Sequence, residues 1–447
     1  MKTSSAQLND LDTAPVGRIF LRYLIPSMIG MLLMAVNIVA DGIMVGNRLG
    51  AAALAGVGIA APVYSIFVAV SLWIGIGAAT KYSSAMGGKD PEEGRRIFSH
   101  ALVSIILITI IIGVIAYAAR TPLAYLLGAN AKTLPFVSDY LYVILIFGVI
   151  LTAENMLSIF IRNDGGPTLA MSALIATSVL NIVLNYLFLF VYDFGVQGAA
   201  FATILASALG ILIMSLHFFK KTNNLKWNRF TFDRRLFAAI VLIGFPSFLS
   251  EVGISVFTIS HNIAFERTAG TDGVAAFAIL NYVHNVLLML FLGLGSAVQP
   301  LISYYRGAKN SRRIRKTMQL AMGTALGLGI AALLAGQFAA GTLVSLFGDF
   351  SPAVRSLAVS GIHLFFLAYL FTGMNFVMMT YYQSTGNVRM ATWITASREI
   401  LIMLLFLAIL PPLFGVTGIW LAIPASEFVV FLGVWLVQRK AARPIIT

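Results

Sequence analysis

One acidic side chain interrupts an apolar stretch near the beginning of the chain. Asp41 lies in the segment NIVADGIMVG, residues 37 to 46, inside an apolar run that begins at Ile19. A charged side chain within a membrane span costs about 2.5 to 3.5 kcal/mol on insertion scales, so it indicates function. A low dielectric disfavours the charged form of a carboxyl group, which suits a residue that exchanges protons. The alternative is an interfacial aspartate that caps a broken helix, since Gly42 follows directly.

Amide and hydroxyl side chains at helical spacing could share a site with this acid. Asn37 precedes Asp41 by one turn, and Asn181 and Asn185 are also four residues apart, so each pair shares a helix face. Asn185 can form hydrogen bonds but does not titrate in a useful range. Thr203 lies at a depth comparable with Asp41, although a threonine can instead bond to the backbone of its own helix.

Other ionisable residues fall inside later apolar runs. Glu251 lies 15 residues into its run, roughly 23 Å along a helix that rises 1.5 Å per residue. We interpret Glu251 as a coupling or substrate-binding residue; a salt bridge to Arg398 and a buried protonated acid are the alternatives. Glu154, Arg398 and Glu399 are weaker candidates. Because Arg398 and Glu399 are adjacent, we expect them on different helix faces without a shared partner, and one of them in a structural ion pair.

The elements that position these residues are apolar runs long enough to cross a bilayer. The chain of 447 residues is 59% hydrophobic and 11% charged, against about 25% charged residues in an average soluble domain. A bilayer core of roughly 30 Å needs about 20 residues of helix. We therefore predict an all-α integral membrane protein with twelve spans: residues 19–47, 52–80, 98–119, 135–160, 168–191, 197–219, 236–265, 273–300, 317–345, 355–382, 390–412 and 416–437.

Lysine and arginine are distributed unequally between the two sides of this arrangement. With both termini on one side, that side holds 24 of the 30 basic residues and the other side holds five. The positive-inside rule then predicts cytoplasmic termini in a multi-pass protein of the cell (inner) membrane. The same bias explains the net charge of +13. A nucleic-acid partner is not expected, because the basic residues form no continuous face or known motif.

An internal repeat divides the chain. FGVQG at 194–198 matches FGVTG at 414–418, a separation of 220 residues that also relates Gly50 to Gly270 and Lys89 to Lys309. We predict two parallel six-helix halves, residues 1–219 and 236–447, around a central cleft and joined by a basic cytoplasmic linker, residues 220–235. Transporters built from such repeats carry substrate between their halves, although duplication can also simply enlarge a bundle. The repeat places His261 at the position equivalent to Asp41. His261 could titrate near neutral pH or serve as a satisfied polar contact.

Several function classes are excluded or disfavoured. The chain has no cysteine, so disulfides, thiol nucleophiles and Cys-based metal sites are absent. Its five histidines show no metal-binding spacing, and no Gly-rich phosphate loop occurs, so we expect neither an enzyme, a resident metal or other cofactor, nor a nucleotide-driven pump. The segment 1–16 lacks the features of a secretory signal and is interpreted as a cytoplasmic tail.

The order of motifs resembles a known transporter family. The twelve spans, the loop RNDGGP at 162–167 with its counterpart QSTGN at 383–387, and FGVQGAAFAT at 194–203 are similar to multidrug and toxic compound extrusion (MATE) transporters. The likeness extends from about residue 15 to residue 437 and is closest to the bacterial branch of MepA-like and DinF-like proteins. It implies two six-helix bundles that export cationic, aromatic drugs in exchange for protons or sodium ions, a role connected with xenobiotic transport and antibiotic resistance.

The resemblance also implies roles for particular residues. It places a coupling carboxylate at Asp41, with Asn37, Asn181, Asn185 and Thr203 around it, and an acid for cation binding in the segment of Glu251. Proton-coupled relatives often carry Asp where this chain has Asn185. We favour protons as the coupling ion; sodium is the alternative, because these five side chains offer several oxygen ligands. We expect a monomer that contacts lipid and small-molecule drugs.

One function within the same superfamily competes with drug export. A flippase for lipid-linked sugars or another amphipathic lipid would be expected to line its cavity with several basic residues. Arg398 is the one basic residue inside a predicted span, which argues against that alternative.

Overall fold

The regular structure of this chain is helical. A computed structural model describes residues 6–220 and 223–440, and within these ranges it contains helices and no strands. Eleven of the described helices are long and apolar enough to cross a membrane. One of them, α9 (Arg234–Gly307), has 74 residues and is interrupted at Gly270, where the backbone is not helical (φ 60°, ψ −153°). Each arm of α9 is long enough for one span, so the prediction of twelve spans is confirmed.

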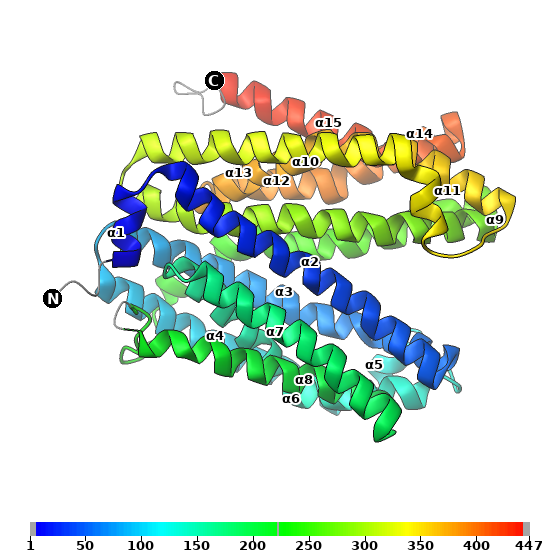
Figure 1. Ribbon diagram of the computed structural model, residues 1–447, viewed down its shortest axis with the longest axis horizontal. Coiled ribbons are helices and arrows are strands. Elements are labelled where there is room, and N and C mark those ends of the chain that lie inside the picture. Colours follow the sequence, from blue (N-terminus) through cyan, green and yellow to red (C-terminus); the bar gives the residue numbers. More distant parts are fainter. Residues whose placement is uncertain (1–5, 221–222, 441–447) are drawn as a thin grey trace. The chain divides into compact units, whose positions relative to one another are not determined.

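The first part of the chain contains ten helical elements (Figure 1). They are α1 (Ala6–Thr13), α2 (Val16–Leu49), α3 (Ala51–Gly87), α4 (Pro91–Ala118), α5 (Arg120–Leu126), α6 (Leu134–Asn163), α7 (Pro167–Tyr186), the π-helix η1 (Leu187–Val191), α8 (Gly195–Ser215) and the 3-10 helix η2 (Leu216–Phe219). The short helices α1 and α5 were not anticipated from hydropathy.

The elements after α9 follow a similar order. They are α10 (Ser311–Ser345), α11 (Pro352–Phe365), the 3-10 helix η3 (Phe366–Ala368), α12 (Tyr369–Ser384), α13 (Val388–Ala396), the π-helix η4 (Ser397–Leu401), α14 (Ile402–Phe414) and α15 (Val416–Lys440). Three spans are thus composites: α7 with η1, α11 with η3 and α12, and α13 with η4 and α14.

Left-handed backbone recurs at the repeat distance of 220 residues. Positive φ angles occur at both members of four such pairs: Gly50 and Gly270, Lys89 and Lys309, Gly128 and Gly348, and Gly195 and Gly415. This backbone region is disfavoured for residues with a Cβ atom, so glycine occupies three of the four pairs. The N-caps repeat as well, because the side chains of Asp90 and Asn310 accept hydrogen bonds from the backbone N–H groups of Glu93 and Arg313. Local geometry therefore follows the duplication seen in the sequence.

Two compact units can be distinguished. The first comprises Met1–Pro15 and Leu21–Phe248, and the second comprises Val16–Phe20 and Leu249–Thr447. In the first unit, α6 packs against α3, α4 and α8, and α7 packs against α8. In the second, α12 packs against α10 and α15, and α14 packs against α15. The division falls within α9, and the predicted domain limits at 219 and 236 remain a prediction.

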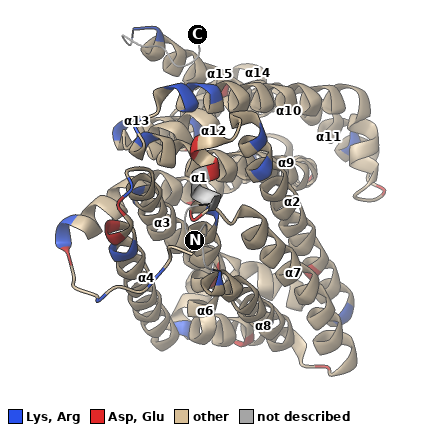
Figure 2. Ribbon diagram, turned by 60° about the vertical axis from the view of Figure 1, so that its left-hand side comes forward, with Lys and Arg blue, Asp and Glu red and all other residues tan. Residues whose placement is uncertain are grey.

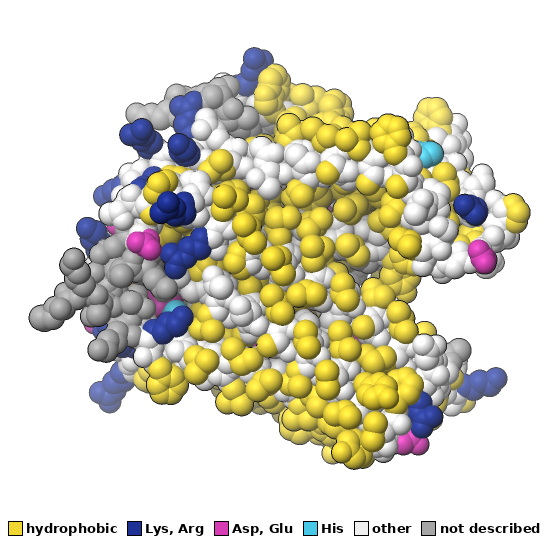
Figure 3. All heavy atoms as spheres, viewed as in Figure 1, with side chains coloured by type: hydrophobic (Ala, Val, Ile, Leu, Met, Phe, Trp, Pro, Cys, Tyr) yellow, Lys and Arg dark blue, Asp and Glu magenta, His cyan; other side chains and the backbone are white. Residues whose placement is uncertain are grey.

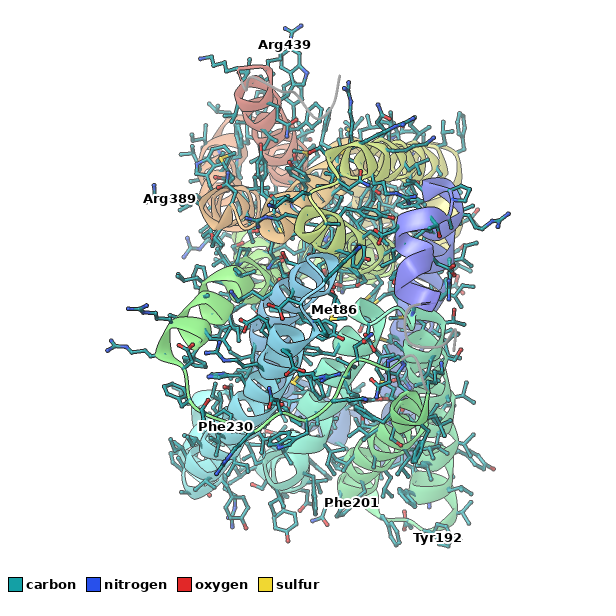
Figure 4. The ribbon with its side chains drawn as sticks, turned by 90° about the vertical axis from the view of Figure 1, so that its left-hand side faces the viewer. Met86, Tyr192, Phe201, Phe230, Arg389 and Arg439 are labelled. Atoms are coloured by element: carbon teal, nitrogen blue, oxygen red, sulfur yellow. The ribbon has the colours of Figure 1, made fainter. Side chains whose placement is uncertain are left out.

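Part of the linker is held firmly by the first unit. Asp164, which is 1% exposed, accepts hydrogen bonds from Tyr82 Oη (2.7 Å), from Asn224 Nδ2 (3.0 Å) and from the Asn224 backbone N–H (3.1 Å), and its carboxylate pairs with His217 Nε2 (2.8 Å). Further along the linker, the ring of Phe230 lies 5.4 Å from that of His100 on α4 (Figure 4). The visible part of the linker is therefore packed structure.

The surface of both units is that of a membrane-embedded bundle. Large hydrophobic side chains are exposed along the helices, among them Ile38, Ile115, Val179, Leu212 and Leu405. Figure 3 shows these apolar sides, and Figure 2 shows that charged residues concentrate toward helix ends and loops. Such a distribution suits lipid contact along the helices and water at their ends.

Candidate functional site

The Asp41 carboxylate is contacted directly by an amide. Asn185 Nδ2 on α7 donates to Asp41 Oδ1 on α2 at 2.7 Å. Asn185 is fully buried, and the π-helix η1 begins two residues after it. π-Helical turns occur frequently at functional sites. The residue that replaces an acid of related transporters is therefore the first neighbour of Asp41.

The other predicted amides complete a chain of polar contacts. Asn185 Nδ2 also lies 3.1 Å from Asn181 Oδ1, one turn earlier on α7. Asn37 Nδ2 on α2 reaches the same Oδ1 atom at 2.8 Å and the Ser178 carbonyl oxygen at 3.2 Å. The helical spacing of four residues thus places both pairs on facing sides of α2 and α7, as the sequence predicted.

Thr203 on α8 fulfils both of the interpretations considered for it. Its Oγ1 accepts from Asn181 Nδ2 at 3.1 Å and donates to the backbone carbonyl of Ala199 at 3.2 Å. A serine or threonine hydroxyl can do both at once, because it carries one donor and two lone pairs. The structure therefore brings together all five predicted residues of the first half in one cluster: Asn37, Asp41, Asn181, Asn185 and Thr203.

The Asn181 amide can take two orientations, and each suits a different form of Asp41. With Oδ1 toward Asn37 and Asn185, that oxygen also lies 2.7 Å from Asp41 Oδ1, which requires a proton between the two oxygens. After rotation by half a turn, the NH2 group donates to Asp41 Oδ1 at 2.7 Å and Oδ2 at 3.2 Å, while the amide oxygen accepts from Thr203 Oγ1. The second orientation suits an ionised carboxylate.

Apolar packing borders this cluster one turn beyond Asp41. Val45 on α2 is 2% exposed and packs with Ala53, Leu189, Val196 and Ala199. The cluster thus has one titratable side chain, neutral hydrogen-bonding partners and a dry border. Within the described ranges, no three His, Cys, Asp or Glu side chains come together as metal ligands. Chemically, the site can hold a proton or offer carboxylate, amide and hydroxyl oxygens to a monovalent cation.

Glu154 lies in a separate polar pocket of the first unit. It is 5% exposed, and Oε1 accepts from Thr177 Oγ1 at 2.7 Å, with a further hydrogen bond from Ser207. Gly210 leaves room for it, because a Cβ atom there would collide with Glu154 Oε1 and Thr177 Oγ1. Glu154 therefore does not join the Asp41 cluster.

The candidates on α9 are not brought together. His261 is 1% exposed and belongs to an aromatic core, where its ring lies 4.5 Å from that of Phe257 and stacks on Phe277 at 5.5 Å. Its Nδ1 contacts the Phe257 carbonyl oxygen at 2.9 Å. Glu251 is half-buried and forms no hydrogen bond or ion pair with the described residues, so the alternative of a salt bridge to Arg398 is wrong.

Arg398 instead pairs with two acids of the second unit. Its NH1 lies 2.9 Å from Glu399 Oε1, and its NH2 lies 3.0 Å from Glu427 Oε1. The expectation that the adjacent residues Arg398 and Glu399 could not share a partner is wrong. Both belong to the π-helix η4, whose wider turn changes the facing of side chains, and the long guanidinium folds back to its neighbour. Glu427 was missed, although an acid within the twelfth apolar run signals it by the rule applied to Asp41.

The second half does not reproduce the Asp41 cluster. At the repeat distance of 220 residues, Asn37 corresponds to Phe257, Asp41 to His261 and Thr203 to Ile423. These three belong to a buried hydrophobic cluster or line it. The candidate coupling cluster therefore exists once in the chain.

Comparison with known proteins agrees with this architecture. The MatE family model matches residues 26–187 and 246–409, which includes the segments of Asp41 and of the amides on α7. The multidrug export protein MepA of Staphylococcus saprophyticus is 24% identical over 435 residues, covering 96% of this chain and 95% of that protein. MepA of Staphylococcus haemolyticus is 25% identical over 441 residues, with 98% and 96% coverage.

Solved structures show the same fold. A MOP superfamily transporter from Pyrococcus furiosus superposes with a TM-score of 0.91 at 24% sequence identity, and the match covers 98% of each chain. A crystal structure of MATE in the bent conformation gives a TM-score of 0.89 at 24% identity, with 98% of this chain and 97% of that chain covered.

Proposed function

The chain belongs to the MatE family, and we propose that it is a secondary active multidrug exporter that moves organic, mostly cationic or aromatic compounds out of the cell in exchange for protons. The chain is a multi-pass membrane protein. Its relatives named MepA are multidrug export proteins. The proposal includes alternating access between the two six-helix halves, cytoplasmic termini and a monomeric state.

The observation that carries the coupling proposal is the composition of the Asp41 cluster. One carboxyl group is surrounded by neutral donors from three helices, α2, α7 and α8, without a cation in contact. A carboxylate without a counter-ion in a low dielectric gains from binding a proton or a cation. Because Asn181 suits either protonation form by rotating its amide, proton exchange would require little movement of the heavy atoms.

Protons are preferred to sodium because the cluster contributes only one charge. Four of its five members are neutral side chains that already bond to one another. Sodium would have to draw their oxygens away from these bonds. The oxygen set nevertheless makes sodium the alternative that the experiment has to distinguish.

The test is export from proteoliposomes that contain the purified protein. Efflux of a fluorescent aromatic monocation such as ethidium is measured under an imposed pH gradient and, separately, under a sodium gradient. The wild type is expected to respond to the pH gradient, and Asp41→Asn is expected to lose that response. Asp193→Asn is the matched control, since Asp193 pairs with Arg48 near the outer helix ends (3.3 Å) and lies outside the cluster. Efflux that is unchanged in Asp41→Asn under both gradients would overturn the proposed role.

A further inference from the structure

A second group of buried charges lies entirely within the second unit. Arg398 on η4, Glu399 beside it and Glu427 on α15 have side chains that are 5%, 13% and 5% exposed. One guanidinium serves two carboxyl groups here. Because burying an unpaired charge is costly, one of the two acids needs a second positive charge or a proton.

Arg398 does not divide its hydrogen bonds equally between the two acids. Its Nε and NH2 both lie 3.0 Å from Glu427 Oε1, and Asn375 Nδ2 on α12 donates to Glu427 Oε2 at 2.7 Å. Both oxygens of Glu427 are therefore satisfied. Two guanidinium contacts and an amide donor favour the ionised form of this acid.

Glu399 is bound on one oxygen only. Its Oε1 accepts from Arg398 NH1 (2.9 Å) and from Ser250 Oγ on α9 (2.9 Å). Its Oε2 is buried and has no hydrogen-bond partner among the described residues. This oxygen lies against Gly253, one turn after Ser250, where any Cβ atom would collide with it. An acid with one bonded and one bare buried oxygen is suited to carrying a proton on the bare oxygen.

No neighbouring element supplies the missing positive charge. On α9, Glu251 is acidic and close enough to interact electrostatically with Glu399. His284, also on α9, contacts Tyr369 Oη at 2.9 Å and is near Arg398, which would oppose a positive charge on the imidazole. On α12, the ring of Phe376 lies 6.0 Å from the guanidinium carbon of Arg398 and carries no charge.

We propose that Glu399 is a proton-binding residue of the second half, separate from Asp41, and that Glu427 remains the ionised counter-ion of Arg398. The proton resides on Glu399 Oε2. Its release leaves the group of three with one net negative charge beside Glu251, and this charge draws a proton back. The site does not depend on the Asp41 cluster, whose second-half equivalents are apolar or lie in the aromatic core.

The repeat supplies a matched control in the first half. A polar group of similar arrangement there consists of Glu154, Thr177 and Ser207. Residues 154 and 177 are related by 221 positions to Asn375 and Arg398, the same offset as between Gly165 and Gly386, and residue 207 is related by 220 to Glu427. Glu154 is thus a buried acid that lacks the arginine, so Glu154→Gln removes a comparable carboxyl group without touching Arg398.

The test is infrared spectroscopy of the purified protein at neutral pH, read in the carbonyl band of protonated carboxylic acids and its shift in deuterated water. An Asp41→Asn/Glu154→Gln background removes two other buried acids. Adding Glu399→Gln is expected to abolish one further carboxylic acid band. Adding Glu427→Gln instead is expected to abolish the same band, because Arg398 then holds Glu399 as its only ionised partner.

The outcomes separate this proposal from the proposed function. A band that persists in Glu399→Gln would overturn it, and so would a band that persists in Glu427→Gln. Should Glu399→Gln not fold, the Glu427→Gln comparison alone decides. Because the measurement needs no transported compound and is made with Asp41 already replaced, failure of coupling at Asp41 does not affect it.

Discussion

Asn185 lies 2.7 Å from Asp41 and donates its amide hydrogen to the carboxylate. This contact joins residues 144 positions apart and sets the chemistry of the cluster, since the nearest partner is neutral. An acid at position 185 would face Asp41 at the same short distance. Two carboxyl groups so close would repel when both are ionised and would share a proton.

Asn185→Asp is therefore expected to move the pH at which export is half-maximal toward alkaline values. The reason is that the paired acids hold a proton more tightly than Asp41 does beside an amide. The measurement is the pH profile of ethidium efflux in proteoliposomes. Asn155→Asp, outside the cluster on α6, is the control, and an identical shift there would show that added charge alone is responsible.

Arg398→Met should destabilise the second unit by about 3 to 5 kcal/mol, the range observed when one partner of a buried ion pair is removed. The variant leaves Glu427 and Glu399 without their common cation. Combining it with Glu427→Gln should recover a substantial part of the loss, because one uncompensated acid disappears. Thermal unfolding in detergent measures both variants, and equal losses in the single and double variants would contradict the expectation.

Gly77→Ala should destabilise the first unit by about 1 to 3 kcal/mol, the usual cost of forcing extra volume into a packed site. A Cβ atom at Gly77 would collide with the backbone carbonyl oxygen of Ile240 on α9, and backbone cannot rotate away as a side chain can. Gly58→Ala on the same helix is the control, because a Cβ atom there has nothing within 4 Å. Equal unfolding temperatures for the two variants would refute this explanation.

Asp233→Ala is expected to lower the unfolding temperature at neutral pH, with a loss that shrinks in acid. Hydrogen bonds from the Leu236 and Arg235 backbone N–H groups, with the Arg96 guanidinium nearby, hold the pKa of Asp233 below its usual value. Its stabilising effect is thus present above the ordinary aspartate pKa of about 3.9 and is lost as pH falls through the lowered folded pKa. Unfolding temperatures at several pH values test this, with Asp233→Asn, which keeps the cap, as the smaller effect.

The spans and the first cluster could be predicted because they depend on hydropathy, depth and a four-residue period. Asn37 and Asp41 face Asn181 and Asn185 since each pair occupies one face of a regular helix. That Asp41 couples export to an ion remains a prediction. The orientation of the Asn181 amide could not be derived, because it depends on Thr203 and on the proton at Asp41.

The second half was predicted less well for local reasons. A π-helical turn at 397–401 has no simple signature in the sequence, and it placed Arg398 and Glu399 together. His261 follows from the repeat, but the aromatic rings that enclose it come from both arms of α9, with Trp420 of α15 in the same cluster. The docking of the linker on Asp164 depends on contacts between residues about 60 positions apart, which hydropathy does not report.

A single residue, Gly50, separates α2 from α3, and hydrogen bonds run from its N–H to Gly46 (3.0 Å) and from Leu54 N–H to its carbonyl (3.1 Å). So short a turn leaves no slack, and the two helices act as the arms of one lever. Asp41 lies nine residues from that fulcrum. A tilt of α2 that follows a change of charge at Asp41 is therefore passed to α3 through the turn.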